Sequence, residues 1–151
     1  MESDSIIGLV VAPAAAGIIA LAISILAFRA RIATKPFRTG VVLAVLPAVG
    51  MAGLFYSLAI HMRCVLGAWP VSIGERGFPP SLIAHGQIAC DYFAIIFLAS
   101  VFVWPIVFLL CYFIRRWRVA IPCLGAYALS FVVCFGSMLL APSRFLNWWW
   151  D

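Results

Sequence analysis

The residues best suited to chemistry lie in one stretch of the sequence, residues 61–91, between two apolar runs. Imidazole, carboxylate and guanidinium groups that share one water-accessible cleft can perform acid–base chemistry or bind an anionic headgroup. Ionisable groups near a membrane are candidate functional residues by default. The candidate catalytic residues are therefore His61, Arg63, Asp91, His85, Glu75 and Arg76.

Arg63 and Asp91 stand close to the two ends of this stretch. Two apolar runs joined by a loop form antiparallel neighbours, so the ends of the stretch are expected at a similar depth. One interpretation is an Arg63–Asp91 ion pair, in which the carboxylate also caps its helix. The other, which we favour, is that each residue ends its own helix in the headgroup layer.

Cys64 and Cys90 are expected at the same depth and form a possible disulfide. The bridge would close a loop of about 27 residues and stabilise the fold by about 3.5 kcal/mol in the chain-entropy model. Neither cysteine belongs to a Cys-x-x-Cys pair, so the spacing does not demand a bridge. The other cysteines, Cys111, Cys123 and Cys134, fall in apolar runs and are interpreted as small apolar residues.

The two histidines, His61 and His85, are the only candidates for holding a haem, or a metal ion together with Asp91 or Cys64. A haem inside a helical bundle requires histidines on facing helices, whereas the pattern puts His85 in a loop. We therefore expect no cofactor and no metal site. The sequence also has no phosphate-binding glycine loop, no His-Glu-x-x-His motif and no convincing nucleophile triad.

The composition indicates whether the chain that carries these residues folds in water or in a lipid bilayer. Apolar residues make up 66% of the chain and charged residues 10%, whereas a soluble domain carries about 25% charged residues. A chain of 151 residues buries too small a share of its surface to hide so many apolar side chains from water. The composition therefore predicts an integral membrane protein, formed by residues 1–151 as a single domain.

The net charge of +5 is distributed in a way that argues against nucleic acid as a partner. Basic residues gather in the cytoplasmic loops of membrane proteins. Seven of the ten basic residues fall in two short stretches, 29–38 and 115–118, which contain no acid and are assigned to the cytoplasmic side. The acidic residues, all then assigned to the outside, are Glu2, Asp4, Glu75, Asp91 and Asp151.

Four apolar runs, residues 6–28, 40–62, 88–114 and 119–141, are long enough to cross a bilayer as helices. A run of 23 residues extends about 34 Å as a helix, against a hydrocarbon core of about 30 Å. The fold predicted is an all-α, four-helix, up-and-down bundle with both termini outside and a folded outer loop at residues 63–87. Pro80 is expected to start a short interfacial helix in this loop. The acidic N-terminus argues against a signal peptide.

Small residues recur at every fourth position in the first two predicted helices. Such residues share one helix face and let two backbones approach closely, so the two stripes are expected to pack on each other or on another subunit. Prolines inside the second and third predicted helices, Pro47 and Pro105, are expected to mark kinks. The residues of the stripes are Gly8, Ala12, Ala16 and Ala20 in the first helix and Gly40, Ala44, Ala48 and Ala52 in the second.

For function, the sequence favours a non-enzymatic accessory, assembly or structural subunit that acts through helix and outer-loop contacts. Its partners are then the lipid bilayer and other membrane subunits or further copies of itself, and its location a bacterial inner membrane. Two alternatives stay open. One is a membrane enzyme or redox protein with its site at the outer face, and the other is a small oligomeric channel or transporter.

Overall fold

The structure, a computed structural model of the chain, describes residues 35–69 and 78–151. Within these two ranges it is built from helices and contains no strand. The first predicted helix, with its stripe of Gly8, Ala12, Ala16 and Ala20, lies outside the described residues, as do Glu75 and Arg76. Three helices are long and apolar enough to cross a membrane: Arg38–Leu66, Pro80–Phe113 and Arg115–Met138. These helices agree with a helical membrane protein.

Helix α2, Lys35–Leu66, corresponds to the second predicted helix and is longer than expected at both ends. It ends at Gly67, whose positive φ of 67° is a backbone conformation that L side chains rarely adopt. The Gly67 amide donates to the carbonyl of Arg63, closing the last turn. The helix therefore continues one turn past the polar residues at which the sequence analysis ended it.

Helix α3, Pro80–Leu98, begins eight residues earlier than predicted. Pro80 is in the first turn, where its missing N–H costs nothing, and the amides of Leu82 and Ile83 bond to the carbonyl of Pro79. Pro80 does start a helix, but that helix runs directly into the membrane-crossing segment. The predicted loop at residues 63–87 is thus shortened at both ends, and the expectation of a separate interfacial helix was wrong.

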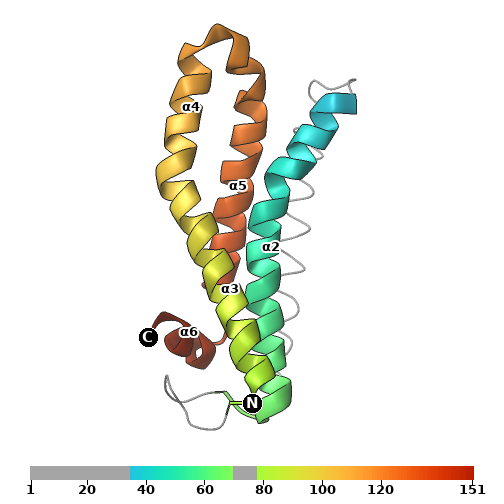
Figure 1. Ribbon diagram of the computed structural model, residues 1–151, viewed down its shortest axis with the longest axis vertical. Coiled ribbons are helices and arrows are strands. Elements are labelled where there is room, and N and C mark those ends of the chain that lie inside the picture. The colour runs from blue at the N-terminus through green and yellow to red at the C-terminus, as the bar shows by residue number, and fades with distance from the viewer. Residues whose placement is uncertain (1–34, 70–77) are drawn as a thin grey trace.

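The third predicted helix is interrupted in its middle. After α3 the backbone forms a wider, π-helical turn, η1 (Ala99–Val103), and then α4, Trp104–Phe113. Figure 1 shows the helix changing direction where α3 gives way to α4. Pro105, in the first turn of α4, cannot donate to the preceding turn. The kink predicted at Pro105 is therefore confirmed, and the wider turn before it accommodates the hydrogen bond that Pro105 does not make.

A short 3-10 helix, η2 (Arg115–Ala120), reverses the chain into α5, Ile121–Met138. The last element is α6, Ser143–Trp150. In Figure 1 it lies across the bundle near the ends of α2 and α3, far from the turn between α4 and α5. Its Phe145 is completely buried, so α6 is part of the packed molecule.

Among the described elements, α2 packs chiefly on α5 and also on α3. A Cβ atom at Gly40 would lie 3.2 Å from the Cys123 sulfur of α5, and Ala48 is completely buried in the core. At Gly40 the small-residue stripe of α2 therefore contacts α5, while the expected contact with the first helix lies outside the described residues. On the same side of α2 the Tyr56 hydroxyl donates to the carbonyl of Ser137 at 2.6 Å, which fixes α5 against α2.

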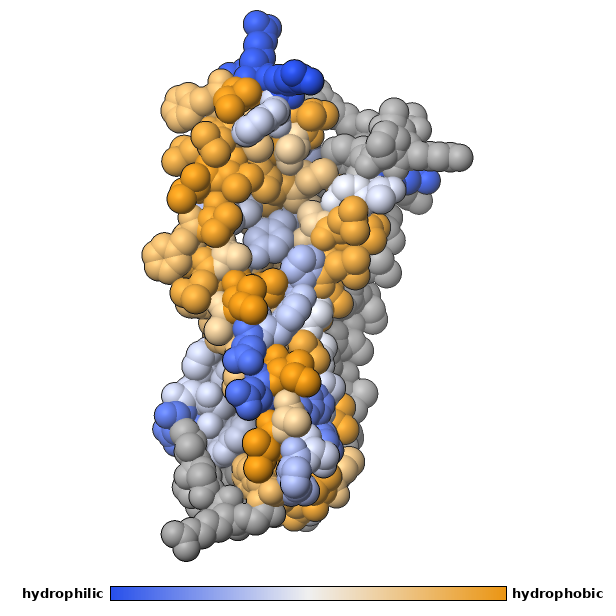
Figure 2. Space-filling view, in the orientation of Figure 1, coloured by the Kyte–Doolittle hydropathy of each residue, from blue (hydrophilic) through white to orange (hydrophobic). Residues whose placement is uncertain are grey.

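The core lies toward the α6 end of the molecule, not along its whole length. Its largest completely buried side chains are Phe55, Phe145, Met51, Leu58, Met62, Leu82 and Met138. Toward the other end, α4 and α5 carry exposed apolar side chains, and Figure 2 shows this apolar surface capped by hydrophilic side chains at the α4–α5 turn.

Candidate functional site

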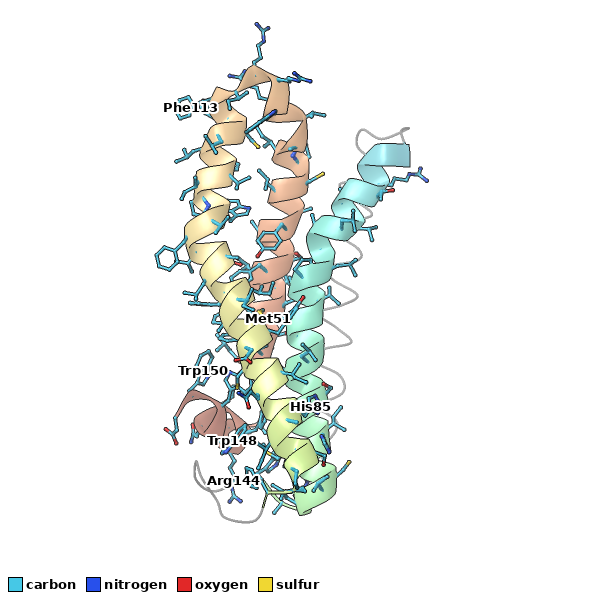
Figure 3. The ribbon with its side chains drawn as sticks, in the orientation of Figure 1. Met51, His85, Phe113, Arg144, Trp148 and Trp150 are labelled. Carbon is cyan, nitrogen blue, oxygen red and sulfur yellow. The ribbon has the colours of Figure 1, made fainter. Side chains whose placement is uncertain are left out.

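Two antiparallel helices bring the two histidines of the sequence together. His61 lies near the end of α2 and His85 in the second turn of α3, and their Nδ1 atoms are 2.9 Å apart. The Nε2 atom of His85 lies 3.0 Å from the Ser57 hydroxyl, one turn before His61 on α2. Both imidazoles are half-buried, and Figure 3 labels His85 near the Pro80 end of α3. We call Ser57, His61 and His85 the histidine site.

The hydrogen-bond partners of Ser57 define where the protons lie. The Ser57 hydroxyl donates to the carbonyl of Leu54 at 2.9 Å, so its single proton is already used. We therefore assign this oxygen as the acceptor from His85, with the His85 proton on Nε2 and a lone pair on Nδ1. With both rings neutral, the remaining contact is a hydrogen bond in which His61 Nδ1–H donates to His85 Nδ1.

The two rings meet head-on. Their centres are 5.2 Å apart and their planes are inclined by 35°. A ring nitrogen lies about 1.15 Å from its ring centre, so nitrogens 2.9 Å apart on a straight line give about 5.2 Å between centres, as observed. The pair can therefore share one proton between its nitrogens, whereas two fully protonated rings would direct N–H groups at each other.

Arg63 is held at the end of α2, away from the histidine site. Its Nη1 donates to the carbonyl of Gly67 at 2.6 Å, and its guanidinium lies 5.8 Å from the ring centre of Trp69. Both contacts are local in sequence. They place the cation at the C-terminus of a helix, where a positive charge is favourable, and they stack it on an aromatic face.

The register between α2 and α3 separates Asp91 from Arg63. His61 lies beside His85, and farther along the pair of helices Gly50 lies beside Tyr92. Asp91 is thus level with about residue 53 of α2, which places Arg63 about 15 Å from it along the helix axis. The structure contradicts the interpretation of an Arg63–Asp91 ion pair, and Asp91 is exposed on the side of α3.

The same register separates the two candidate disulfide cysteines. Cys64 and Cys90 are free thiols, both exposed. They lie about 15 Å apart along the axis, at a rise of 1.5 Å per residue, whereas bridged cysteines need Cα atoms within about 7 Å. The possible bridge is therefore not formed, because α3 begins at Pro80 and carries Cys90 about two turns farther along than the predicted loop implied.

The sequence pattern predicted His85 in a loop and did not indicate Ser57 as its partner. The sequence does contain a spacing that favours His85 on a helix. Leu82 and Ala89 are both buried and are seven residues apart, with His85 between them and Tyr92 one turn beyond. This is the spacing of one face of a helix, continuous with the apolar run that follows. The turn residues of the loop obscured it.

An aromatic cluster supports the helix ends that carry the histidine site. Phe145 of α6 contacts Phe55 of α2 with ring centres 5.0 Å apart and Trp69 at 5.8 Å. Trp149 contacts Phe55 at 5.1 Å and Phe93 of α3 at 5.7 Å, both edge to face. Edge-to-face pairs of this kind stabilise beyond their buried area by about 0.5–1.5 kcal/mol. Helix α6 thereby links α2 to α3 toward the end of the molecule that carries the histidine site.

Among the residues that the structure describes, no group of three His, Cys, Asp or Glu side chains converges as a metal site would. The histidine site therefore offers two imidazoles and one hydroxyl. Comparison with protein-family models, with curated proteins and with solved structures finds no match.

Proposed function

We propose that this chain is a membrane subunit that works through contacts between its helices and a partner within the bilayer. The observation that carries the proposal is the exposure of Pro80–Phe113. In its most apolar stretch of 18 residues, no residue is buried within the molecule. In the corresponding stretch of Arg38–Leu66, 39% of the residues are buried. A membrane helix that is packed on its neighbours buries one face, so an unburied helix has a face left for another protein.

The exposed surface is broad and consists of large side chains. Phe102 is 62% exposed and Phe113 74%, and both lie toward the arginine-rich end of the molecule. Figure 2 shows the apolar surface over this part of the chain. Lipid covers part of any such surface. A partner helix would cover the rest, and aromatic side chains are enriched at protein interfaces.

The charge distribution supports an orientation for this subunit. Arg115, Arg116 and Arg118 form the turn between α4 and α5, and Arg38 lies toward the same end on α2. Asp91 and Asp151 lie toward the α6 end. Because basic residues stay on the cytoplasmic side, we place the α4–α5 turn inside and the histidine site with α6 outside, in a bacterial inner membrane.

The experiment uses a photo-crosslinking amino acid placed at Phe102, followed by purification from native membranes in mild detergent and mass spectrometry. The same amino acid at Ile83, which is 55% exposed but lies at the α6 end, is the matched control. A partner captured at residue 102 and absent at residue 83 supports the proposal. Adducts with lipid alone at residue 102 would overturn it.

A second candidate is an enzyme or binding protein of the outer face, and the hydrogen-bonded histidine site is the observation that favours it. An activity that is lost in His61→Ala and kept in Arg63→Ala would point to the histidine site, since Arg63 is not one of its three residues. The channel alternative receives no such support. The hydroxyl groups of Ser100, Ser130 and Ser137 each donate to a carbonyl within their own helix, which leaves few polar groups for a path.

A further inference from the structure

We propose that the histidine site binds a divalent transition-metal ion, with His61 Nδ1 and His85 Nδ1 as the two protein ligands. This inference goes beyond a contact-based function and does not depend on it. Neutral imidazole is the side chain that Zn²⁺, Co²⁺, Ni²⁺ and Cu²⁺ share as a ligand. Two imidazoles from neighbouring helices, with their nitrogens 2.9 Å apart, provide half of a tetrahedral site, and water supplies the remaining positions.

The second argument is the proton arrangement around His85. Ser57 accepts the Nε2 proton of His85, because its own proton goes to the carbonyl of Leu54. A histidine that binds a metal through one nitrogen almost always donates its other N–H to a fixed oxygen, which sets the tautomer and the ring orientation. Ser57 is placed to act as such a positioning residue. The lone pair on Nδ1 of His85 is therefore directed at His61 before any metal arrives.

The separation of the rings also suits a metal. A tetrahedral ion bound at about 2.05 Å to both rings puts the nitrogens about 3.3 Å apart and the ring centres about 5.2 Å apart. The ring centres are already 5.2 Å apart. The nitrogens need to separate by about 0.4 Å from their present 2.9 Å, which changes in the two side-chain conformations must supply.

The proton balance of metal binding is simple. In the neutral metal-free pair, the His61 proton on Nδ1 lies between the two nitrogens. On metal binding this proton moves to Nε2 of His61 through solvent, and the metal takes the two Nδ1 lone pairs. Neither the metal ion nor any side chain is oxidised or reduced, and His85 keeps its proton on Nε2, facing Ser57.

The test uses the full chain in detergent micelles with Co²⁺ as the probe. The affinity tag must contain no histidine, and Cys64→Ser and Cys90→Ser remove the exposed thiols as competing ligands. We expect one Co²⁺ per chain, with the visible absorption of a four-coordinate ion, displaced by Zn²⁺. His61→Ala and His85→Ala should each weaken binding by at least about tenfold, while Gln87→Ala, exposed on the same turn of α3, should leave it unchanged.

Ser57 gives a test that keeps both rings in place. Ser57→Ala should weaken Co²⁺ binding by about 10- to 100-fold, the usual effect of losing an outer partner of a metal-bound histidine. Ser57→Thr keeps the hydroxyl and should restore the affinity, which a merely structural effect would not do. Equal Co²⁺ binding by the original chain and a His61→Ala/His85→Ala double variant would overturn the proposal, as would no binding by the original chain.

Discussion

At the scale of single residues, the structure depends on a few polar contacts between helices whose surfaces are otherwise apolar. The contacts of His85 with Ser57 and with His61 join α2 to α3, and the Tyr56 hydroxyl joins α2 to α5. Interhelical hydrogen bonds in membranes contribute on average about 0.6 kcal/mol each. Their main effect is therefore to set the register of the helices. The register in turn decides which side chains can form a site.

Gly50 provides a test of close helix approach. A Cβ atom at Gly50 would lie 2.9 Å from the Tyr92 hydroxyl, which donates to the carbonyl of Pro47 at 3.3 Å. Gly50→Ala should therefore displace Tyr92 and break this bond. Gly53→Ala, where nothing lies within 4 Å, is the matched control. Both variants gain the same helix propensity, so we expect the Gly50 variant to be less stable by about 1 kcal/mol in a detergent unfolding titration.

Removing the hydroxyl group of Tyr92 tests whether it causes the lower stability of Gly50→Ala. In a Tyr92→Phe background the oxygen that meets the new methyl group is absent, and the difference between Gly50→Ala and Gly53→Ala should shrink. An unchanged difference would show that the Tyr92 hydroxyl is not the cause of the lower stability of the Gly50 variant.

At the scale of elements, α6 is the feature that holds the histidine end of the bundle together. Phe145 is completely buried and contacts aromatic rings of α2, of the segment after α2 and of α6 itself. Phe145→Ala should lower the free energy of unfolding by about 3–5 kcal/mol, because it leaves a cavity among these rings. Phe113→Ala, at a side chain that is 74% exposed, should change it by less than about 0.5 kcal/mol.

Thermal unfolding monitored by tryptophan fluorescence is suited to this comparison, because Trp148 and Trp149 lie in the cluster around Phe145. Detachment of α6 should shift the emission as well as the midpoint. If the Phe145 and Phe113 variants unfold alike, α6 is not packed against the bundle.

At the scale of the whole molecule, the long helices extend beyond the hydrocarbon core. The helix from Pro80 to Phe113 has 34 residues. At 1.5 Å per residue this is about 51 Å, against a core of about 30 Å. Apart from Ser100, whose hydroxyl bonds to the carbonyl of Ile96, its serine, histidine, glutamine and aspartate residues all lie in its first 12 residues: Ser81, His85, Gln87 and Asp91. We therefore expect the apolar residues 92–114 to cross the bilayer and the histidine site to be within reach of water.

The proposed orientation can be tested by labelling engineered cysteines with a membrane-impermeant maleimide. In a Cys64→Ser/Cys90→Ser background, Ser143→Cys on α6 should react in intact cells, and Arg116→Cys in the α4–α5 turn only after permeabilisation. Both positions are exposed, so access to the reagent depends on the side of the membrane. The opposite labelling pattern would show that the topology is inverted and that the histidine site faces the cytoplasm.

Hydropathy and proline positions predict a helical chain, the location of three helices that are apolar enough to cross a membrane, and the bend at Pro105 in one of them. Hydropathy and proline effects are local, since they depend on residues within a few turns of one another. The sequence also identified His61 and His85 as candidates but separated them, because the turn residues around Pro80 hid the start of α3.

Which of the candidate site residues come into contact depends on how the helices pack on one another. Asp91 and Cys90 are close in sequence to His85, yet the register of α3 on α2 carries them about 15 Å from Arg63 and Cys64. The same register places the nitrogens of His61 and His85 2.9 Å apart and Ser57 beside them. Register arises from the packing of residues far apart in the chain, such as Phe145 on Phe55 and Tyr56 on Ser137. No local pattern in the sequence carries that information.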